Sequence, residues 1–428
     1  MFKVTARTVL ELGSELISSD VIAFYELIKN GFDARTENGV EVRFDVVLGL
    51  RSFSSLRNRS KEQEVPLQNL KERCLSELNS AATTIYDKAQ KLIAAADSYD
   101  QLSKALNEVY SLNTIRVIDT GTGMSATDLE DKFLVIGTPS RKIAVEKSVA
   151  EGQKKPDFLG EKGLGRLSAM RLGGTLSIET ARKKDTKLNH LSIDWRAFED
   201  VNKMIEDIDI KASTSGAKRS PNYSGTVLTI SELTSDWNEG RIKQLAAEDF
   251  AFLTNPLADS RNRPRIALVW NGERIPVPML GKSFLKLAHA SIWGAYTLGE
   301  SGPQLTLNLK LRELGFEHPV VEEELRFGEK DLFAMIRGRD EAIPEDALTD
   351  LGPFTFEAHW YNRRRVKAEG GMDREQILKL HRQWTGIRMY RDDFRVYPYG
   401  QEKDDWLGLD RGVCVILCPD AFSYAMGK

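Results

Sequence analysis

Three polar side chains at helical spacing form the first candidate site. Glu26, Asn30 and Asp33 lie within the segment DVIAFYELIKNGFDA, at positions i, i+4 and i+7, so a helix would present all three on one face. A carboxylate, an amide and a second carboxylate in a row suit Mg²⁺, which prefers oxygen ligands and keeps several water molecules. An ordinary solvated face has the same pattern, so this motif alone does not identify a site.

A second candidate follows residues 114–119, which read as a strand. The sequence continues as DTGTGM and places Asp119, Gly121, Gly123 and Met124 together, and ligand sites collect where strands end in layered α/β folds. A buried carboxylate there can accept a hydrogen bond from an exocyclic amine such as that of adenine, and glycines let the backbone approach a flat ring. A simple strand-ending turn is the alternative interpretation.

The third candidate is GEKGLGR, residues 160–166, which leads into a predicted helix. Gly160, Gly163 and Gly165 permit unusual backbone angles, so the amides and the helix N-terminus could cradle phosphates. The chain has no G-x-x-x-x-G-K-[ST], so this is not a Walker A loop. The looser dinucleotide pattern G-x-G-x-x-A occurs at residues 121–126, but no early βαβ unit accompanies it.

The order, spacing and settings of the three motifs are far more specific together than apart. YELIKNGFDA, DTGTGM and GEKGLGR resemble the N, G1 and G2 boxes of the GHKL ATPases, the superfamily of gyrase B, the heat-shock protein 90 chaperones, histidine kinases and MutL. SGTVLTISEL, residues 224–233, looks like the later strand of that family with its motif threonine, here Thr226. The match covers residues 10–235, roughly half of the chain.

The resemblance implies a role for each matching position. Glu26 would be the general base that orients the attacking water, Asn30 the Mg²⁺ ligand, and Asp33 a support for the same helix face. Asp119 would bind the adenine amino group of ATP, and Thr226 would bond to Asp119 or to a bridging water. Phosphoryl transfer needs mainly positioning and charge neutralisation, so few groups suffice. The other implied nucleotide contacts are Gly121, Gly123, Met124, Lys142, Gly160, Lys162, Gly163, Leu164 and Gly165.

By the same resemblance, residues 136–165 would form a lid over the nucleotide. Gly163 and Gly165 would lie against the phosphates, while Lys142 and Lys162 are candidate phosphate contacts or ordinary exposed lysines. The Gly, Ser and Lys content of the segment is typical of a loop that moves to gate nucleotide entry.

Periodicity predicts the elements that must position these residues. Residues 20–34 read as a helix with Asp20 as its N-cap. Apolar residues between Leu67 and Ala96 recur about every 3.6 positions, which predicts amphipathic helices inserted between two strands. A helical hairpin packed on the domain and a partner or dimerisation helix both fit this insert. Residues 211–223 read as an exposed loop. Further helices are expected at 126–135, 166–171 and 375–384, and strands at 40–48, 114–119, 175–180, 191–195, 225–230, 266–270, 305–311, 354–360, 387–390 and 394–397.

These elements predict an α+β chain with two domains. Residues 1–240 would form a Bergerat-type α/β sandwich that binds ATP, with the helical insert at about 50–112, and residues 245–428 a second, transducer-like α+β domain. An ATPase domain in the N-terminal position resembles the chaperone, MutL, gyrase and MORC arrangement.

In those families the second domain often lends a basic residue to the γ-phosphate. The sequence does not choose among its candidates, and a solvated edge or a local, salt-dependent nucleic-acid contact would also explain the first four. The candidates are Arg363, Arg364, Arg365, Lys367, Arg388 and Arg391.

Composition sets the outer limits. The 428 residues include 60 Lys and Arg against 63 Asp and Glu, a net charge of −3, which excludes a bulk polybasic nucleic-acid binder. Three cysteines exclude a disulfide scaffold and fit a reducing, cytoplasmic compartment. The start of the chain does not read as a signal peptide, and we find no apolar run of about 18 residues that would predict a membrane span.

The expected function is an Mg-ATP-driven conformational switch that binds and hydrolyses ATP, closes its lid and moves its second domain. An ATP-dependent homodimer or a partner protein is expected, with bacterial defence or DNA handling as the setting suggested by analogy. Two alternatives stay open: a protein histidine kinase and a non-hydrolysing nucleotide-binding scaffold. Against the kinase, all five histidines follow the boxes, and none lies in a convincing phospho-acceptor helix.

Overall fold

The computed structural model places most of the chain in two compact units. The first contains Met1–Met279 and Ile387–Lys428, and the second contains Leu280–Gly386. The described residues are 4–135, 167–218, 220–257, 264–286, 288–311, 321–336, 346–361, 374–384, 386–391 and 393–396.

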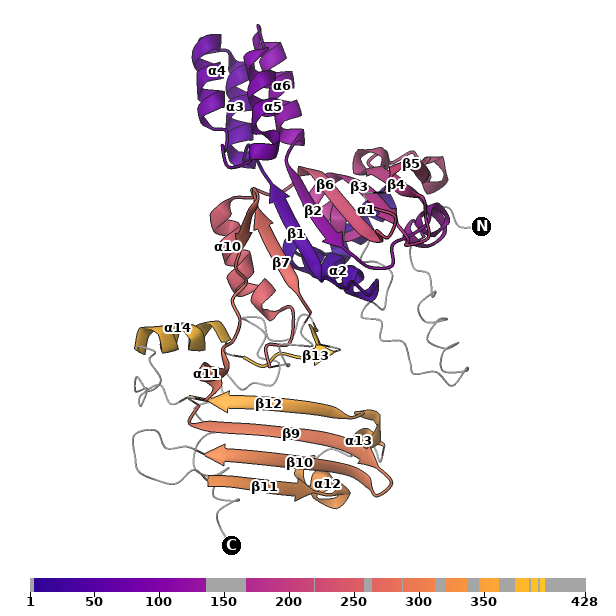
Figure 1. The fold of residues 1–428 in the computed structure, drawn as a ribbon, viewed down its shortest axis with the longest axis vertical. Helices are drawn as coiled ribbons and strands as arrows, with labels where there is room; N and C mark the ends of the chain where they lie inside the picture. Colours follow the sequence, from indigo (N-terminus) through magenta and orange to yellow (C-terminus); the bar gives the residue numbers. More distant parts are fainter. Residues whose placement is uncertain are drawn as a thin grey trace. The chain divides into compact units, whose positions relative to one another are not determined.

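An eight-stranded sheet organises the first unit (Figure 1). Its strand order is β5-β4-β3-β6-β2-β1-β7-β8, in which β1 and β7 run parallel and the other neighbours run antiparallel. The strands are β1 (Val40–Asp45), β2 (Thr114–Asp119), β3 (Gly173–Ala181), β4 (Lys187–Asp194), β5 (Ser213–Ala217), β6 (Gly225–Leu233), β7 (Ile266–Trp270) and β8 (Glu273–Ile275).

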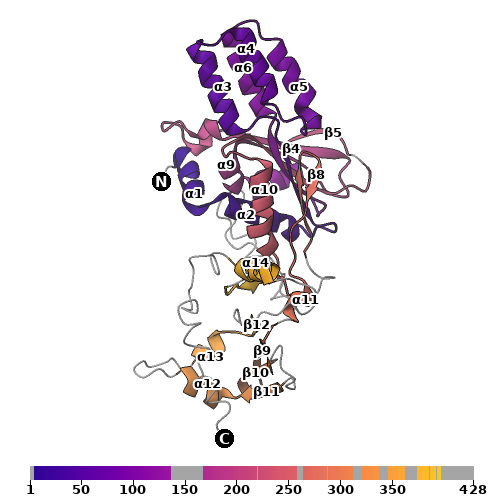
Figure 2. The ribbon, with the colours of Figure 1, turned by 90° about the vertical axis from the view of Figure 1, so that its left-hand side faces the viewer.

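Helices α1 (Arg7–Leu16), α2 (Asp20–Asp33), α9 (Ser168–Leu172) and α10 (Glu239–Glu248) lie on one side of this sheet (Figure 2). The core between them is largely aromatic. The ring of Phe24 in α2 lies 5.6 Å from Phe44 of β1 and 5.7 Å from Trp237. Side chains alternate across a strand, and Asp119 shares the buried face of β2 with Ile115 and Val117. The α/β sandwich predicted for this region is confirmed.

The helical insert is a four-helix body rather than a hairpin. Its own buried cluster includes Leu70, Cys74 and Ile93. The apolar period that the sequence shows between Leu67 and Ala96 is interrupted where the chain turns between the second and third helices. At this turn Ala81, which fits the period, is exposed, and Ala82 is buried instead. The helices are α3 (Leu50–Glu62), α4 (Leu67–Ser76), α5 (Thr83–Ala94) and α6 (Tyr99–Ser111).

The second unit is an antiparallel sheet of four strands, ordered β11-β10-β9-β12. Tyr296, Leu332 and Leu348 form its buried cluster, and the Tyr296 hydroxyl donates to the Leu348 carbonyl. The elements are α11 (Lys282–Leu285), β9 (Ala290–Gly299), β10 (Gly302–Leu311), β11 (Val321–Phe327), α12 (Glu329–Ile336), α13 (Ala347–Asp350), β12 (Phe354–Trp360) and α14 (Arg374–Trp384).

Three strands expected in the second domain belong to the first unit instead. Strand β7 pairs with β1, Val40 opposite Ile266 through Phe44 opposite Trp270. The chain also returns from the second unit to form the short hairpin of β13 (Tyr390–Arg391) and β14 (Phe394–Arg395). The first unit therefore runs past residue 240, where the sequence predicts its end, because β7 pairs with β1 and extends the sheet.

Smaller elements complete the first unit. The loop expected at residues 211–223 contains β5 at the edge of the sheet. No helix in the described part of the chain is both long and apolar enough to cross a membrane. The remaining elements are α7 (Ala126–Asp128), the π-helical turn η1 (Leu129–Phe133), and the 3₁₀ turns η3 (Trp195–Phe198), η4 (Ile205–Asp207) and η5 (Phe250–Phe252).

Candidate functional site

Helix α2 carries the first three candidate residues on its solvent-facing margin. Glu26, Asn30 and Asp33 are each half-buried, while Phe24 and Ile28 of the same helix are fully buried. The helix is stable because its apolar residues recur at helical spacing and pack against the sheet. Its polar residues lie at the edge of this packed face. The three side chains are thus placed where they can meet both protein and solvent.

The start of α2 is fixed by ion pairs. The N-cap is Ser19, whose hydroxyl accepts from the Ile22 amide, so the prediction that Asp20 caps the helix was wrong. Ser19 has the extended backbone that an N-cap needs, and Asp20 already lies in the first turn. The Asp20 carboxylate, 11% exposed, instead binds Arg171 of α9 at 3.2 Å and Arg241 of α10 at 2.6 Å.

The end of α2 is joined to the Asp119 turn. Gly31 lies so close to β2 that a Cβ on it would come 3.3 Å from the Cβ of Asp119. The Thr122 amide donates to the Ala34 carbonyl at 2.8 Å, and a Cβ on Gly121 would lie only 2.4 Å from that same oxygen. The structure therefore brings the polar end of α2 and the Asp119 turn into direct contact.

Asp119 itself is a buried carboxylate, 9% exposed. Burial raises its pKa to about 6, while hydrogen bonds from the backbone of Gly121 and from the backbone and side chain of Thr226 oppose that shift. The Gly121 amide donates to Oδ1 at 2.8 Å. At neutral pH most of this group is ionised, so the carboxylate can accept a hydrogen bond from an amine.

Two residues that the motifs did not indicate hold the turn from the other side. The Met124 amide donates to Oγ1 of Thr180 at 2.9 Å, and Nδ2 of Asn189 donates to the Met124 carbonyl at 2.9 Å. The Thr180 and Thr226 hydroxyl oxygens are 3.0 Å apart. Thr180 in β3 and Asn189 in β4 are polar residues at buried positions of their strands. A polar residue at such a position is the feature that could have indicated them. Gly123 has φ +66°, a backbone conformation that favours glycine.

The predicted phosphate side of the site lies outside the described residues. This holds for the lid, residues 136–165, and for the arginine cluster of the second domain. Of the two other basic candidates, Arg388 places its guanidinium 3.9 Å from the ring centroid of Phe252. The predicted site residues that fall outside are Lys142, Gly160, Lys162, Gly163, Leu164 and Gly165, together with Arg363, Arg364, Arg365 and Lys367.

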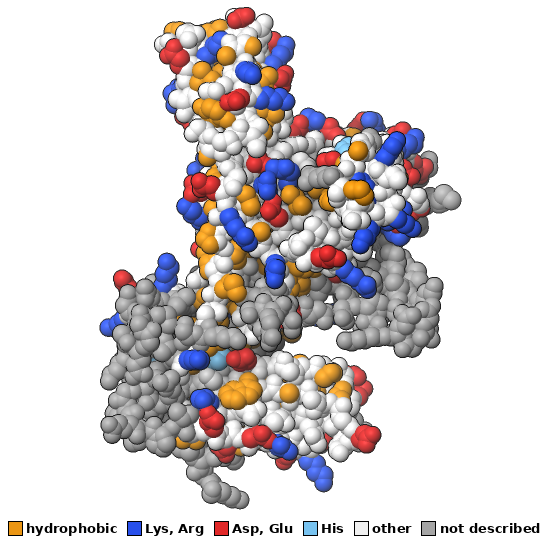
Figure 3. Space-filling model, in the orientation of Figure 1, with side chains coloured by type: hydrophobic (Ala, Val, Ile, Leu, Met, Phe, Trp, Pro, Cys, Tyr) orange, Lys and Arg blue, Asp and Glu red, His pale blue; other side chains and the backbone are white. Residues whose placement is uncertain are grey.

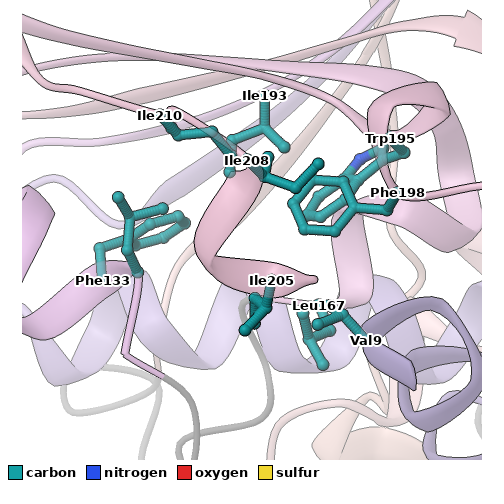
Figure 4. A pocket seen from close by; sticks show the side chains of 10 residues that line it. Val9, Phe133, Leu167, Ile193, Trp195, Phe198, Ile205, Ile208 and Ile210 are labelled. Atoms are coloured by element: carbon teal, nitrogen blue, oxygen red, sulfur yellow. The ribbon is translucent and has the colours of Figure 1, made fainter. Parts of the chain in front are cut away.

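A separate apolar pocket has a volume of about 190 Å³ (Figure 4). Some of the residues that line it flank the predicted lid, residues 136–165, in the sequence. Its wall includes Phe133 and Leu134 before the segment and Leu167 after it. None of the described site residues lines it, and its side chains offer nothing that would neutralise a phosphate. The lining residues are Val9, Phe133, Leu134, Leu167, Ile193, Trp195, Phe198, Ile205, Ile208 and Ile210.

The polar side chains near Asp119 suit a metal ion that is held mainly by the phosphates of a bound ligand and by water. The described residues contain no group of three or more His, Cys, Asp or Glu side chains able to enclose a metal ion. Mg²⁺ bound by one or two protein oxygens, phosphates and water needs no such cage. The half-buried Asn30, one helical position from the residue that contacts Asp119, fits that mode of binding.

Comparison with known proteins identifies the same part of the chain. A family model described as histidine kinase-, DNA gyrase B-, and HSP90-like ATPase matches residues 98–226. That range includes Asp119, the turn that follows it and Thr226, but not α2.

A curated relative agrees with that match. The chain is 24% identical to the chaperone protein HtpG of Treponema denticola over 194 residues. These residues are 44% of this chain and 30% of the relative. The chain therefore spans less than a third of that relative's length. The resemblance of this region to the histidine kinase-, DNA gyrase B- and HSP90-like ATPases, which the motifs predicted, is confirmed.

Proposed function

We propose that the chain binds Mg-ATP between α2 and the Asp119 turn, hydrolyses it, and uses the cycle as a conformational switch. The observation that carries this proposal is the junction of the two elements at Gly31, where the helix lies against Asp119. This approach joins the helix that carries Glu26, Asn30 and Asp33 to the strand that carries Asp119. The family model covers Asp119, and the helix supports the proposal through its resemblance to the N box.

Each residue then has a chemical task. Asp119 accepts a hydrogen bond from the adenine amino group and selects the base. Asn30 holds Mg²⁺, which supplies charge neutralisation on the phosphates, and Asp33 supports that part of the helix. Glu26 lies one helical turn before Asn30 and takes the proton of the attacking water. Positioning and electrostatics of this kind account for most catalysis of phosphoryl transfer.

The switch itself is the larger movement that these contacts drive. Residues 136–165 close over the phosphates, and the unit Leu280–Gly386 responds to that closure. The support is the resemblance of the motifs and the division of the chain into two compact units.

We also propose that the ATP-bound chain acts as a homodimer or with a partner protein, in bacterial defence or DNA handling. The support is analogy with the N-terminal ATPase families named above. Light scattering with and without a non-hydrolysable ATP analogue decides between self-association and a separate partner, and unchanged turnover on addition of DNA would exclude the DNA-handling setting.

The central test compares the wild-type chain with Glu26→Ala. We expect Glu26→Ala to bind Mg-ATP as the wild type does and to release phosphate about 100-fold more slowly or worse, because a lost general base typically costs that much. Equilibrium ATP binding and phosphate release are measured on the same preparations. Glu108→Ala, an exposed carboxylate on α6, is the matched control and should behave as wild type.

The same assay separates the alternatives. ATP binding without any turnover by the wild type would indicate a nucleotide-binding scaffold. Stable, acid-labile label on protein after incubation with γ-labelled ATP would indicate a histidine kinase and contradict the switch.

A further inference from the structure

The hairpin β13–β14 belongs to the first unit although it follows the second unit in the chain. The Asn255 amide donates to the Asp393 carbonyl at 2.8 Å, and the Arg395 amide donates to the Leu253 carbonyl at 3.0 Å. The Tyr390 hydroxyl donates to the Phe252 carbonyl at 3.3 Å. These bonds fix the backbone of the hairpin against residues 252–255.

The hairpin so fixed presents one aromatic ring to the candidate site helix. Phe394 is 3% exposed, and its ring centroid lies 4.9 Å from that of Phe32, with the planes inclined by 53°. Tilted rings at this separation attract each other beyond their buried area. Phe32 lies in the last turn of α2, between Asn30 and Asp33.

That last turn needs support because a helix end lacks part of its own hydrogen bonding. One side of it is held by Gly31 against Val40 and Asp119. The chain leaves the helix at Arg35 through a left-handed residue with φ +58°. The contact with Phe394 holds another side of the same turn.

We propose that Phe394 is a positioning residue for the nucleotide site: through Phe32 it fixes the last turn of α2 and with it the side chains of Asn30 and Asp33. This inference rests on the proposed function and extends it to a segment that none of the ATPase motifs contains. Because the chain reaches Phe394 only after passing through Leu280–Gly386, the contact also links the path of the second unit to the metal-binding end of the helix.

The test is the Mg²⁺ dependence of ATP binding and turnover in the full-length chain. Phe394→Leu keeps an apolar side chain but loses the ring contact, so we expect the Mg²⁺ concentration for half-maximal effect to rise about 3- to 10-fold. ATP affinity without metal should stay as in the wild type, since Asp119 is not displaced. Phe32→Leu should give the same shift, and the double variant no further one, because both changes remove one contact.

Phe53→Leu is the matched control, since it removes a ring contact with Tyr110, at 4.3 Å, in the helical insert and leaves the Phe32–Phe394 pair intact. It should leave the Mg²⁺ dependence unchanged. Thermal unfolding is followed for every variant, and if Phe394→Leu does not fold, Phe32→Leu and Phe394→Met decide the question.

An unchanged Mg²⁺ dependence in folded Phe394 and Phe32 variants would overturn the inference, as would an equal shift in Phe53→Leu. Additive shifts in the double variant would also overturn it. If the wild type binds Mg-ATP but does not hydrolyse it, only the proposed hydrolysis is contradicted. The Mg²⁺ dependence of ATP binding then still tests the role of Phe394.

Discussion

Asp119 combines two properties that a base-recognising carboxylate needs, burial and satisfied hydrogen bonding. Burial raises its pKa from the ordinary 3.8 to about 6, and the bonds from Gly121 and Thr226 keep that rise moderate. Because folding raises the pKa, ionising this group costs the folded state stability as the pH rises from about 4 through 6. The domain thus carries a charged group at neutral pH that its own fold disfavours, as expected for a binding residue.

This shift predicts how ligand affinity depends on pH. The ionised carboxylate accepts from the adenine amine more strongly than the neutral carboxyl does, so affinity for adenosine should fall as the pH is lowered through about 6. Adenosine is the suitable probe because it carries no phosphate that titrates in this range. Calorimetric or competition binding between pH 5 and 8 measures the effect.

Asp119→Asn is the control for that titration. It should bind adenosine poorly at every pH, with no step near 6. Equal affinity of the wild type at pH 5 and 7.5 would remove Asp119 from the base pocket.

Among single residues, the sequence indicates those that belong to continuous motifs. Glu26, Asn30 and Asp119 were predicted in this way. Thr180 and Asn189 were not, because they contact Met124 from positions 56 and 65 residues further along the chain. Only the pairing of β3, β4 and β6 brings them to the turn.

At the scale of elements, the approach of α2 to the sheet depends on a residue without a side chain. A Cβ at Gly31 would lie 2.7 Å from Cγ2 of Val40 and 3.3 Å from Cβ of Asp119. The first of these distances is too short for two carbon atoms, so the helix or the strand has to move if a side chain is added.

Gly31→Ala should therefore destabilise the first unit by about 1–3 kcal/mol, the usual cost of overpacking. It should also weaken ATP binding, since Val40 pairs with Asp119 across β1 and β2 and both lie against Gly31. Chemical denaturation and equilibrium binding measure the two effects. Gly299→Ala, where an added Cβ meets no atom within 4 Å, is the control. Full stability together with wild-type affinity in Gly31→Ala would refute the close junction of helix and turn.

Local periodicity located most elements but not their partners. The patterns of α2, β1 and β2 were recognisable because each has one buried face. The parallel partner of β1 was not, since β7 lies more than 200 residues further along the chain and its apolar run fits any buried sheet. The four-helix insert was read as one period because its turns contain few glycines or prolines.

At the scale of the whole molecule, the described part of one face carries charges of both signs. On the face that Figure 3 shows, Lys and Arg side chains are interspersed with Asp and Glu over the described surface. This agrees with the net charge of −3. Specificity for the proposed anionic ligand would therefore depend on local groups rather than on the overall charge.

The chain passes from the first unit to the second and back, and this path would give the proposed switch its route. Leu280–Gly386 is inserted between two parts of one compact unit, so it is tethered at both of its ends. One tether leads through α14 to the hairpin that contacts α2. A movement of the inserted unit can thus act on the helix that carries Glu26 and Asn30.

Hydrogen exchange of the full-length chain, with and without Mg-ATP, tests the central claim most directly. Glu26→Ala is used so that the bound nucleotide is not turned over during labelling. We expect protection to concentrate in residues 20–35 and 119–124, the two segments that Gly31 joins. Bound Mg-ATP that leaves both segments exchanging as in the free chain would contradict the claim.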